Sequence, residues 1–195
     1  MAGIAGVPLL FLDVDGPLIP FGAAHAYPTY ESGRPNPGID GHPLLGRIDP
    51  AHGERLLALG CELVWATTWM QDANDGIGPR LGLPRLEVVA WPEPSALDQR
   101  DAWEGVHWKT RTLIERAEGR PFIWIDDEIT EADRLRVAAD HQGHALLHRV
   151  DARLGLTDTD YALLNGWLHR LGKSVGDVVR SDGPRLRRRR PPHRR

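Results

Sequence analysis

Near its N-terminus the chain reads Val7-Pro-Leu-Leu-Phe-Leu-Asp-Val-Asp-Gly16, an apolar run followed by two acidic residues and a glycine. A short apolar run that stops at turn residues is typical of a strand buried on both faces of a parallel sheet. The two carboxylates after it would repel each other unless a cation lay between them, and Gly16 lets the chain turn across a bound anion. An acid-rich turn without a ligand is the alternative. The stretch predicts a buried first strand and makes Asp13 and Asp15 candidates for a site at its end.

Further apolar runs alternate with helical patterns along the chain. Strands are expected over residues 62–66, 86–90, 121–125 and 145–150, and helices over 50–60, 70–80, 109–118, 129–141 and 157–171. Strands that alternate with helices in this way favour parallel βαβ units. The predicted fold class is therefore α/β, with a three-layer, Rossmann-like parallel sheet of about five strands.

Polar residues follow three of the predicted strands. Asp13 and Asp15 follow the first strand, and Thr67 follows the second. Asp126 and Asp127 follow the fourth. The carboxyl ends of parallel strands meet at one edge of a sheet, where α/β proteins bind ligands. Taken singly, Thr67 is a common strand-end hydroxyl and the aspartate pair a common helix cap. Their conjunction favours a single pocket that collects these side chains.

In their order along the chain these residues resemble the four motifs of haloacid dehalogenase-like (HAD) superfamily phosphohydrolases. The motifs match Phe11-Leu-Asp-Val-Asp-Gly-Pro-Leu18, Leu63-Val-Trp-Ala-Thr67, Lys109 and Ile123-Trp-Ile-Asp-Asp127. Pro17 departs from the family, which usually has Thr or Val there, and proline removes a backbone N–H. The stretches 65–74 and 124–128 further resemble a small, capless bacterial HAD subgroup, some members of which accompany RNA-repair modules.

The resemblance implies a role for each residue. Asp13 would be the nucleophile that attacks phosphorus and forms an aspartyl-phosphate. Asp15 would protonate the leaving oxygen and then activate water. Thr67 and Lys109 would bind the phosphoryl group, and Lys109 would also balance the charge of the nucleophile. The remaining substrate contacts would come from Gly16, Thr68 and Trp69.

The implied cofactor is Mg²⁺, which prefers octahedral oxygen ligands. The ion would take the Asp13 carboxylate, the Asp15 backbone carbonyl and one carboxylate of the Asp126-Asp127 pair. Asp127 is the preferred ligand, with Asp126 orienting Lys109, although the sequence alone does not separate the two. A zinc site is not expected, because ligand-like spacing is lacking among His25, His42 and His52.

The gaps between the motifs bear on the substrate. Residues 17–48 are too short and irregular for a helical cap domain, and residues 69–108 already hold a helix, a strand and a loop. A capless or minimally capped HAD protein has an open site, and capless relatives tend to act on phosphorylated macromolecules, including nucleic-acid ends.

The expected function is Mg²⁺-dependent hydrolysis of a phosphate monoester through an aspartyl-phosphate. The alternative is a catalytically silent HAD-like module that binds phosphorylated ligands. Four tryptophans could stack bases near the opening of the site: Trp69, Trp91, Trp103 and Trp108. The alternative is that these indoles only pack in the core or at its edge.

Charge is unevenly distributed along the chain. Its 195 residues carry a net charge of −3, and seven arginines lie within residues 185–195. Without these seven, 17 basic residues stand against 27 acidic ones, a net charge of −10. The arginine-rich end would contact nucleic acid or another polyanion, and the alternative is a solvated extension. The expected division is a HAD-like hydrolase domain over residues 1–172 and a disordered tail over residues 173–195.

Composition narrows the class of protein. Apolar residues make up 41% and charged residues 26%, which is ordinary for a globular protein and excludes a disordered chain. The single cysteine, Cys61, cannot form an intramolecular disulfide. Asp13 and Asp15 interrupt the N-terminal apolar run, so neither a signal peptide nor a membrane span is expected. We expect a soluble, cytoplasmic protein without a membrane partner; no pattern indicates its oligomeric state.

Overall fold

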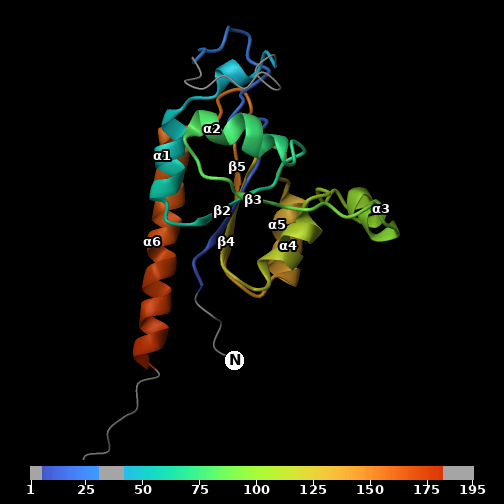
Figure 1. Cartoon of the computed structure of the whole chain (residues 1–195). Coiled ribbons are helices and arrows are strands. Elements are labelled where there is room, and N and C mark those ends of the chain that lie inside the picture. The colour runs from blue at the N-terminus through green and yellow to red at the C-terminus, as the bar shows by residue number, and fades with distance from the viewer. Residues whose placement is uncertain (1–5, 31–41, 182–195) are drawn as a thin grey trace, which may run out of the picture.

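The computed structural model describes residues 6–30 and 42–181, with side chains up to residue 173 (Figure 1). Five strands form one sheet in the order β3-β2-β1-β4-β5, and every neighbouring pair is parallel. The strands are β1 (Leu9–Leu12), β2 (Glu62–Trp65), β3 (Glu87–Val88), β4 (Phe122–Asp126) and β5 (Ala145–Arg149). The predicted α/β class and five-stranded parallel sheet are confirmed.

Six α-helices surround the sheet: α1 (Ala51–Ala58), α2 (Gly78–Leu81), α3 (Ala96–Trp103), α4 (Thr110–Ala117), α5 (Glu131–Asp140) and α6 (Asp158–Ser181). Two short turns complete the set, the 3-10 helix η1 (Leu45–Arg47) and the π-helix η2 (Ala73–Ile77). The helix expected over 70–80 is therefore η2 followed by α2. Sequence reasoning did not separate α3, although Ser95 and Asp98 form a capping box at its start.

The last helix is longer than the sequence pattern suggested. It was expected to end at residue 171, and α6 continues to Ser181. The predicted tail, which began at residue 173, thus starts within this helix. Its arginine-rich part lies outside the described residues.

Helices cover both faces of the sheet. Side chains alternate along β1: Leu10 and Leu12 belong to the core shared with α1, α2 and α6, whereas Leu9 and Phe11 belong to the core shared with α4 and α5. Figure 1 shows α1 and α6 on one side of the strands and α4 and α5 on the other. Because successive side chains of a strand point to opposite faces, burial on both faces requires the continuous apolar run of β1. The fold therefore has the expected three layers.

The strand order changes direction between the neighbouring strands β1 and β4. From β1 the chain proceeds to β2 and β3 on one side, and from β4 it proceeds to β5 on the other. Such a topological switch point is where open α/β sheets bind ligands. Leu12 pairs with Ile125, so the residues that follow, Asp13 and Asp126, lie side by side at the carboxyl edge.

Two long connections leave strands at this edge, one from β1 to α1 and one from β3 to α4. The connection from β1 to α1 contains an isolated bridge between Asp15 and Ile19 and the turn η1. The connection from β3 to α4 contains α3, which stands away from the sheet in Figure 1. Within the described residues, neither connection contains more than one short helix. Separately, none of the described helices is both long and apolar enough to cross a membrane.

Candidate active site

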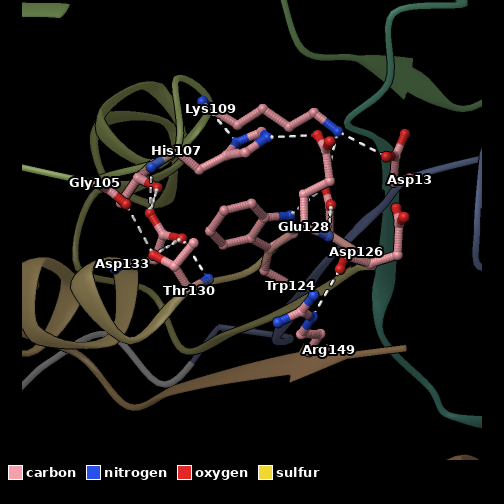
Figure 2. Close-up of polar contacts among 12 residues, drawn as sticks. Asp13, Gly105, His107, Lys109, Trp124, Asp126, Glu128, Thr130, Asp133 and Arg149 are labelled. Atoms are coloured by element: carbon pink, nitrogen blue, oxygen red, sulfur yellow. Dashed lines mark hydrogen bonds and ion pairs between the residues drawn. The ribbon is translucent and has the colours of Figure 1, made fainter. Parts of the chain in front are cut away.

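A buried lysine joins the first and fourth motifs. Lys109 Nζ lies 2.8 Å from Asp13 Oδ2 and 2.8 Å from Asp126 Oδ2 (Figure 2). All three side chains are buried, and Asp126 is completely so. Lys109 directly precedes α4, Asp13 follows β1 and Asp126 ends β4, so the tertiary fold brings together three separate segments. The result is one ammonium held between two carboxylates in a poorly solvated setting.

Burial governs the protonation of this cluster. It raises the pKa of Asp13 from 3.8 to about 7, with Lys109 opposing the shift and Asp126 adding to it. Burial by itself would lower the pKa of Lys109, but the carboxylates of Asp13 and Asp126 outweigh it and raise that pKa. Lys109 therefore stays charged at neutral pH. The carboxyl group of Asp13 is present in both its protonated and its ionised form at this pH when no other cation is near.

The two fourth-motif aspartates have different surroundings. Asp126 Oδ2 accepts hydrogen bonds from Lys109 Nζ at 2.8 Å and from the Trp124 indole at 3.2 Å, and its Oδ1 accepts the Glu128 N–H at 2.9 Å. Asp127 is half-buried, and among the described residues no other side chain hydrogen bonds or ion pairs with its carboxylate. Asp126 is thus a fixed partner of Lys109, and Asp127 is the carboxylate left open.

Three carboxylates can offer ligand oxygens here. Oxygens of Asp13, Asp126 and Asp127 all lie within 4.8 Å of one another. Asp126 already accepts three hydrogen bonds, so Asp13 and Asp127 have more oxygen lone pairs left for an ion. Burial also raises the pKa of Asp127, and the neighbouring charges of Asp126 and Glu128 raise it further. A cation would relieve this crowding of negative charge, and an all-oxygen donor set fits a hard divalent cation.

A second group of ligand-type residues supports the turn that carries Lys109. The Lys109 N–H donates to Nδ1 of His107 at 3.2 Å, which assigns the neutral ring's proton to Nε2. That nitrogen lies 3.0 Å from Glu128 Oε2 (Figure 2). Both ring nitrogens are therefore used to hold the backbone beside Lys109. Sequence reasoning missed His107 and Glu128, and also Trp124, whose position two residues before Asp126 on one strand places both on the same face.

Gly16 lies against Asp127. Its φ is +82°, and a Cβ atom placed on it would lie 2.6 Å from Cγ of Asp127. No side chain fits in that space, and the left-handed backbone disfavours any other residue. The glycine of the first motif therefore permits the turn and also the close approach of the open carboxylate.

The segment that follows the second motif holds Asp15 through the indole of Trp69. Trp69 Nε1 donates to Asp15 Oδ2 at 2.9 Å, and the Trp69 N–H donates to Thr67 Oγ1 at 3.3 Å. Thr67 is completely buried, whereas Thr68 is exposed. The next residue, Met70, has a φ of +50°, which is uncommon outside glycine. Asp15 and Thr67 are thus connected by one tryptophan at the end of β2.

The predicted stacking tryptophans are in three different situations. Trp69 contacts Asp15, and the Trp91 indole donates to the Thr67 carbonyl at 3.1 Å. The rings of Trp91 and Trp108 meet edge to face at 4.7 Å. Trp103 on α3 is 93% exposed. Two of the four indoles therefore make hydrogen bonds at the end of β2, and Trp108 remains 43% exposed beside Lys109.

The parallel sheet, with an acidic cluster and a buried lysine where β1 and β4 end, defines an HAD-like domain with a Rossmannoid core. A family model described as "HAD domain in Swiss Army Knife RNA repair proteins" matches residues 9–161, and the chain belongs to this family. The match spans all four motifs. No curated protein and no solved structure shows significant similarity to the chain.

Proposed function

We propose that this protein is a Mg²⁺-dependent phosphohydrolase that releases phosphate from a monoester through an aspartyl-phosphate. The observation that carries the proposal is the buried Asp13–Lys109–Asp126 cluster beside the open Asp127 carboxylate. Family membership supports the same class of reaction. The individual roles are those that the HAD motifs imply for the matching residues, and the contacts of these side chains are compatible with them.

In the first step, an oxygen of the Asp13 carboxylate attacks phosphorus, and the bond from phosphorus to the leaving oxygen breaks. Asp13 Oδ1 accepts the Val14 N–H at 2.8 Å and Oδ2 contacts Lys109, so the nucleophile has a fixed orientation. Asp15 gives its proton to the leaving oxygen, which departs as an alcohol. Lys109 offsets the negative charge that gathers around phosphorus.

In the second step, Asp15 takes a proton from water, and the water oxygen attacks phosphorus. The bond between phosphorus and the Asp13 oxygen breaks, which releases inorganic phosphate and restores the carboxylate. The Trp69 indole holds one oxygen of Asp15 through both steps, and the other oxygen is free to exchange the proton. Thr67 would bind a phosphoryl oxygen at the end of β2.

Asp13, Asp127 and the Asp15 carbonyl would hold Mg²⁺. The bound ion supplies charge neutralisation at the phosphoryl oxygens. Asp126 is the positioning residue that keeps the ammonium of Lys109 directed at Asp13, since its own oxygens are occupied.

The proposed substrate is a phosphorylated nucleic-acid end. Two observations favour it: the family is described from RNA repair proteins, and the described part of the connection from β1 to α1 holds no α-helix that would form a helical cap. A site without a helical cap admits a phosphate at the end of a large molecule. The seven arginines within residues 185–195 would add a polyanion contact from outside the described residues.

Phosphate release from a generic aryl phosphate, with and without Mg²⁺, tests the proposed activity. Release should depend on Mg²⁺ and vanish in Asp13→Asn, with mass spectrometry excluding amide hydrolysis back to aspartate. Asp15→Asn should slow release by about 10²–10⁴-fold. Transient labelling of Asp13 by substrate phosphate should accompany turnover. Retained ligand binding without any release from a broad set of phosphate esters would instead establish the silent phosphate-binding module.

Two neighbouring variants separate the proposed roles of the aspartates. Asp127→Asn should raise the Mg²⁺ concentration needed for half-maximal rate and change the metal-free melting temperature little. Asp126→Asn should lower the melting temperature, because a buried partner of Lys109 is lost. The opposite pattern would exchange their assignments.

Deletion of residues 185–195 tests the polyanion contact. Activity on the aryl phosphate should not change. Affinity for a phosphorylated oligonucleotide should fall, and the salt dependence of binding should flatten by about 0.7–0.9 in slope for each lost phosphate contact. Equal affinity and slope in the two proteins would identify the segment as a solvated extension.

A further inference from the structure

A hollow of about 580 Å³ opens beside the catalytic cluster, on the β5 side. Asp127 is one of its lining residues, together with Phe21, Arg149 and Arg153. Its volume lies within the range of about 300–1,000 Å³ that small-ligand sites occupy. None of the four HAD motifs accounts for Phe21, Arg149 or Arg153, so the hollow extends the site beyond the residues that handle the phosphoryl group.

Arg149 is an exposed cation fixed next to the open carboxylate. It ends β5 in register with Asp126, and its Nε donates to the Asp127 carbonyl oxygen at 2.8 Å (Figure 2). Among the described residues no carboxylate lies within ion-pair distance of its guanidinium. The terminal nitrogens therefore retain their charge and donors for a ligand, next to a site otherwise dominated by acids.

Arg153 lines the same hollow but is already neutralised. Its Nε and Nη2 donate hydrogen bonds to the two carboxylate oxygens of Asp151, at 3.1 and 2.9 Å. The two arginines thus share a location and differ in whether a carboxylate already occupies the guanidinium. This difference provides a matched control for charge at the hollow.

Phe21 supplies an apolar surface to the hollow. Its side chain is 42% exposed, and its N–H donates to the Ala152 carbonyl at 2.8 Å, which fixes the backbone that carries the ring. An exposed aromatic ring next to an unpaired guanidinium matches the two parts of a nucleotide, the base that stacks and the phosphate that accepts bidentate hydrogen bonds.

We propose that this hollow binds the end of a phosphorylated oligonucleotide: Phe21 stacks on the terminal base, and Arg149 binds the phosphodiester that links it to the next nucleotide. The inference rests on the proposed function, since the terminal phosphate would lie at Asp13 and Asp127. It names the part of the site that distinguishes a nucleic-acid end from a small phosphate ester. A phosphopeptide offers neither a nucleobase nor a phosphodiester.

Binding to Asp13→Asn protein in Mg²⁺ tests the proposal without turnover. The probes are pentanucleotides of RNA and DNA phosphorylated at the 3′ or the 5′ end, the corresponding mononucleotides, and a phosphopeptide. Arg149→Ala should weaken pentanucleotide binding about 10-fold and reduce its salt slope by about 0.7. The double change Arg153→Ala with Asp151→Ala removes the neutral pair from the same hollow without changing its net charge, and it should change binding less than about twofold. Mononucleotide binding should be far less sensitive to Arg149→Ala, because a mononucleotide lacks the phosphodiester. If Arg149→Ala instead acted by displacing Asp127, the binding of mononucleotides and pentanucleotides would weaken equally. That result would overturn the proposed phosphodiester contact of Arg149.

The aromatic contact has its own matched pair. Phe21→Leu should weaken mononucleotide and pentanucleotide binding by about fivefold or more, since a stacked base contributes roughly 1–3 kcal/mol. Trp108 is similarly exposed, at 43%, in a separate cleft with Trp91, and Trp108→Leu should have little effect. A larger loss in Trp108→Leu would place the base in the tryptophan cleft and refute the proposal, as would tighter binding of the phosphopeptide with the same dependence on Arg149.

Failure of the inference and failure of the proposed function give different results. If wild-type protein releases phosphate from an aryl ester but no oligonucleotide end binds, the phosphohydrolase stands and the hollow does not bind nucleic acid. If no ester is hydrolysed while the Arg149 and Phe21 effects on binding hold, the hollow stands and the hydrolytic function fails.

Discussion

The indole Nε1 of Trp69 donates a hydrogen bond to Oδ2 of Asp15 across 2.9 Å, and the two residues are 54 positions apart in the chain. Asp15 follows β1 and Trp69 follows β2, so the parallel pairing of these strands brings them together. The bond restrains a carboxylate that is otherwise only half-buried. We infer that Trp69 positions the proposed acid and base toward the leaving oxygen.

Trp69→Phe should therefore slow hydrolysis by about 10-fold, since a hydrogen bond to a charged group contributes roughly 1.5–3 kcal/mol. The loss should be larger for an alkyl phosphate than for a nitrophenyl phosphate, because a poor leaving group depends more on protonation. Steady-state rates on the two esters measure this. Trp103→Phe, on the exposed α3, is the control. Equal losses on both esters would indicate a purely structural role for Trp69.

Replacement of Lys109 should affect both folding and catalysis. Lys109→Met leaves the carboxylates of Asp13 and Asp126 without their shared cation, and breaking a buried ion pair in this way costs about 3–5 kcal/mol. The rate should fall by about 10²-fold or more. Urea unfolding without metal and single-turnover kinetics measure the two effects. Lys173→Met, at the only other lysine and on an exposed part of α6, should change neither; a stable and fully active Lys109→Met would remove Lys109 from the mechanism.

Two glycines with left-handed backbones separate strain from crowding. A Cβ at Gly16 would press on Asp127, whereas a Cβ at Gly60 would meet nothing within 4 Å. Gly16→Ala and Gly60→Ala should both destabilise the fold through strain, by roughly 1–2 kcal/mol. Only Gly16→Ala should raise the Mg²⁺ concentration for half-maximal rate, by about 10-fold or more, because it displaces a proposed ligand. An unchanged Mg²⁺ requirement in Gly16→Ala would argue against Asp127 as a ligand.

The raised pKa of Asp13 predicts a pH-dependent stability. The folded, metal-free protein retains the Asp13 proton up to about pH 7, whereas an unfolded chain releases it near 3.8. The folded state binds more protons in this window, so its free energy of unfolding should fall as pH rises from about 4 to about 7. Asp13→Asn should reduce this slope.

Bound Mg²⁺ should counteract this loss of stability at higher pH. Mg²⁺ competes with the proton on Asp13, so saturating Mg²⁺ should raise the melting temperature more at about pH 8 than at about pH 5.5. Thermal unfolding at both pH values, with and without Mg²⁺, measures this difference. A larger effect of Mg²⁺ at the lower pH would show that Asp13 is not a ligand.

The sequence by itself determined the sheet and the membership of the acidic cluster. The apolar run before Asp13 and the similar run before Asp126 identify central strands, because only a strand buried on both faces lacks polar residues for its whole length. Their carboxyl ends must share one edge in a parallel sheet, so the sequence predicts one pocket for both acidic motifs. That β1 and β4 are neighbours, with Asp13 beside Asp126, is a result of the strand order in the structure. Lys109 was identified as a site residue from its position between the second and fourth motifs of the HAD resemblance.

Tertiary structure decided which aspartate is open and which is occupied. Asp126 and Asp127 are adjacent in the chain, but they point to different surroundings, since the side chains of successive residues leave an extended chain in opposite directions. Asp126 enters the buried layer with Lys109 and Trp124, and Asp127 lies against Gly16. Contacts between distant segments, such as Trp69 with Asp15 or Arg149 with the Asp127 carbonyl, leave no periodic trace in the sequence. These contacts form because the segments that follow different strands pack against one another at the carboxyl edge of the sheet. The conformation of each segment therefore depends on neighbours that are distant in the sequence.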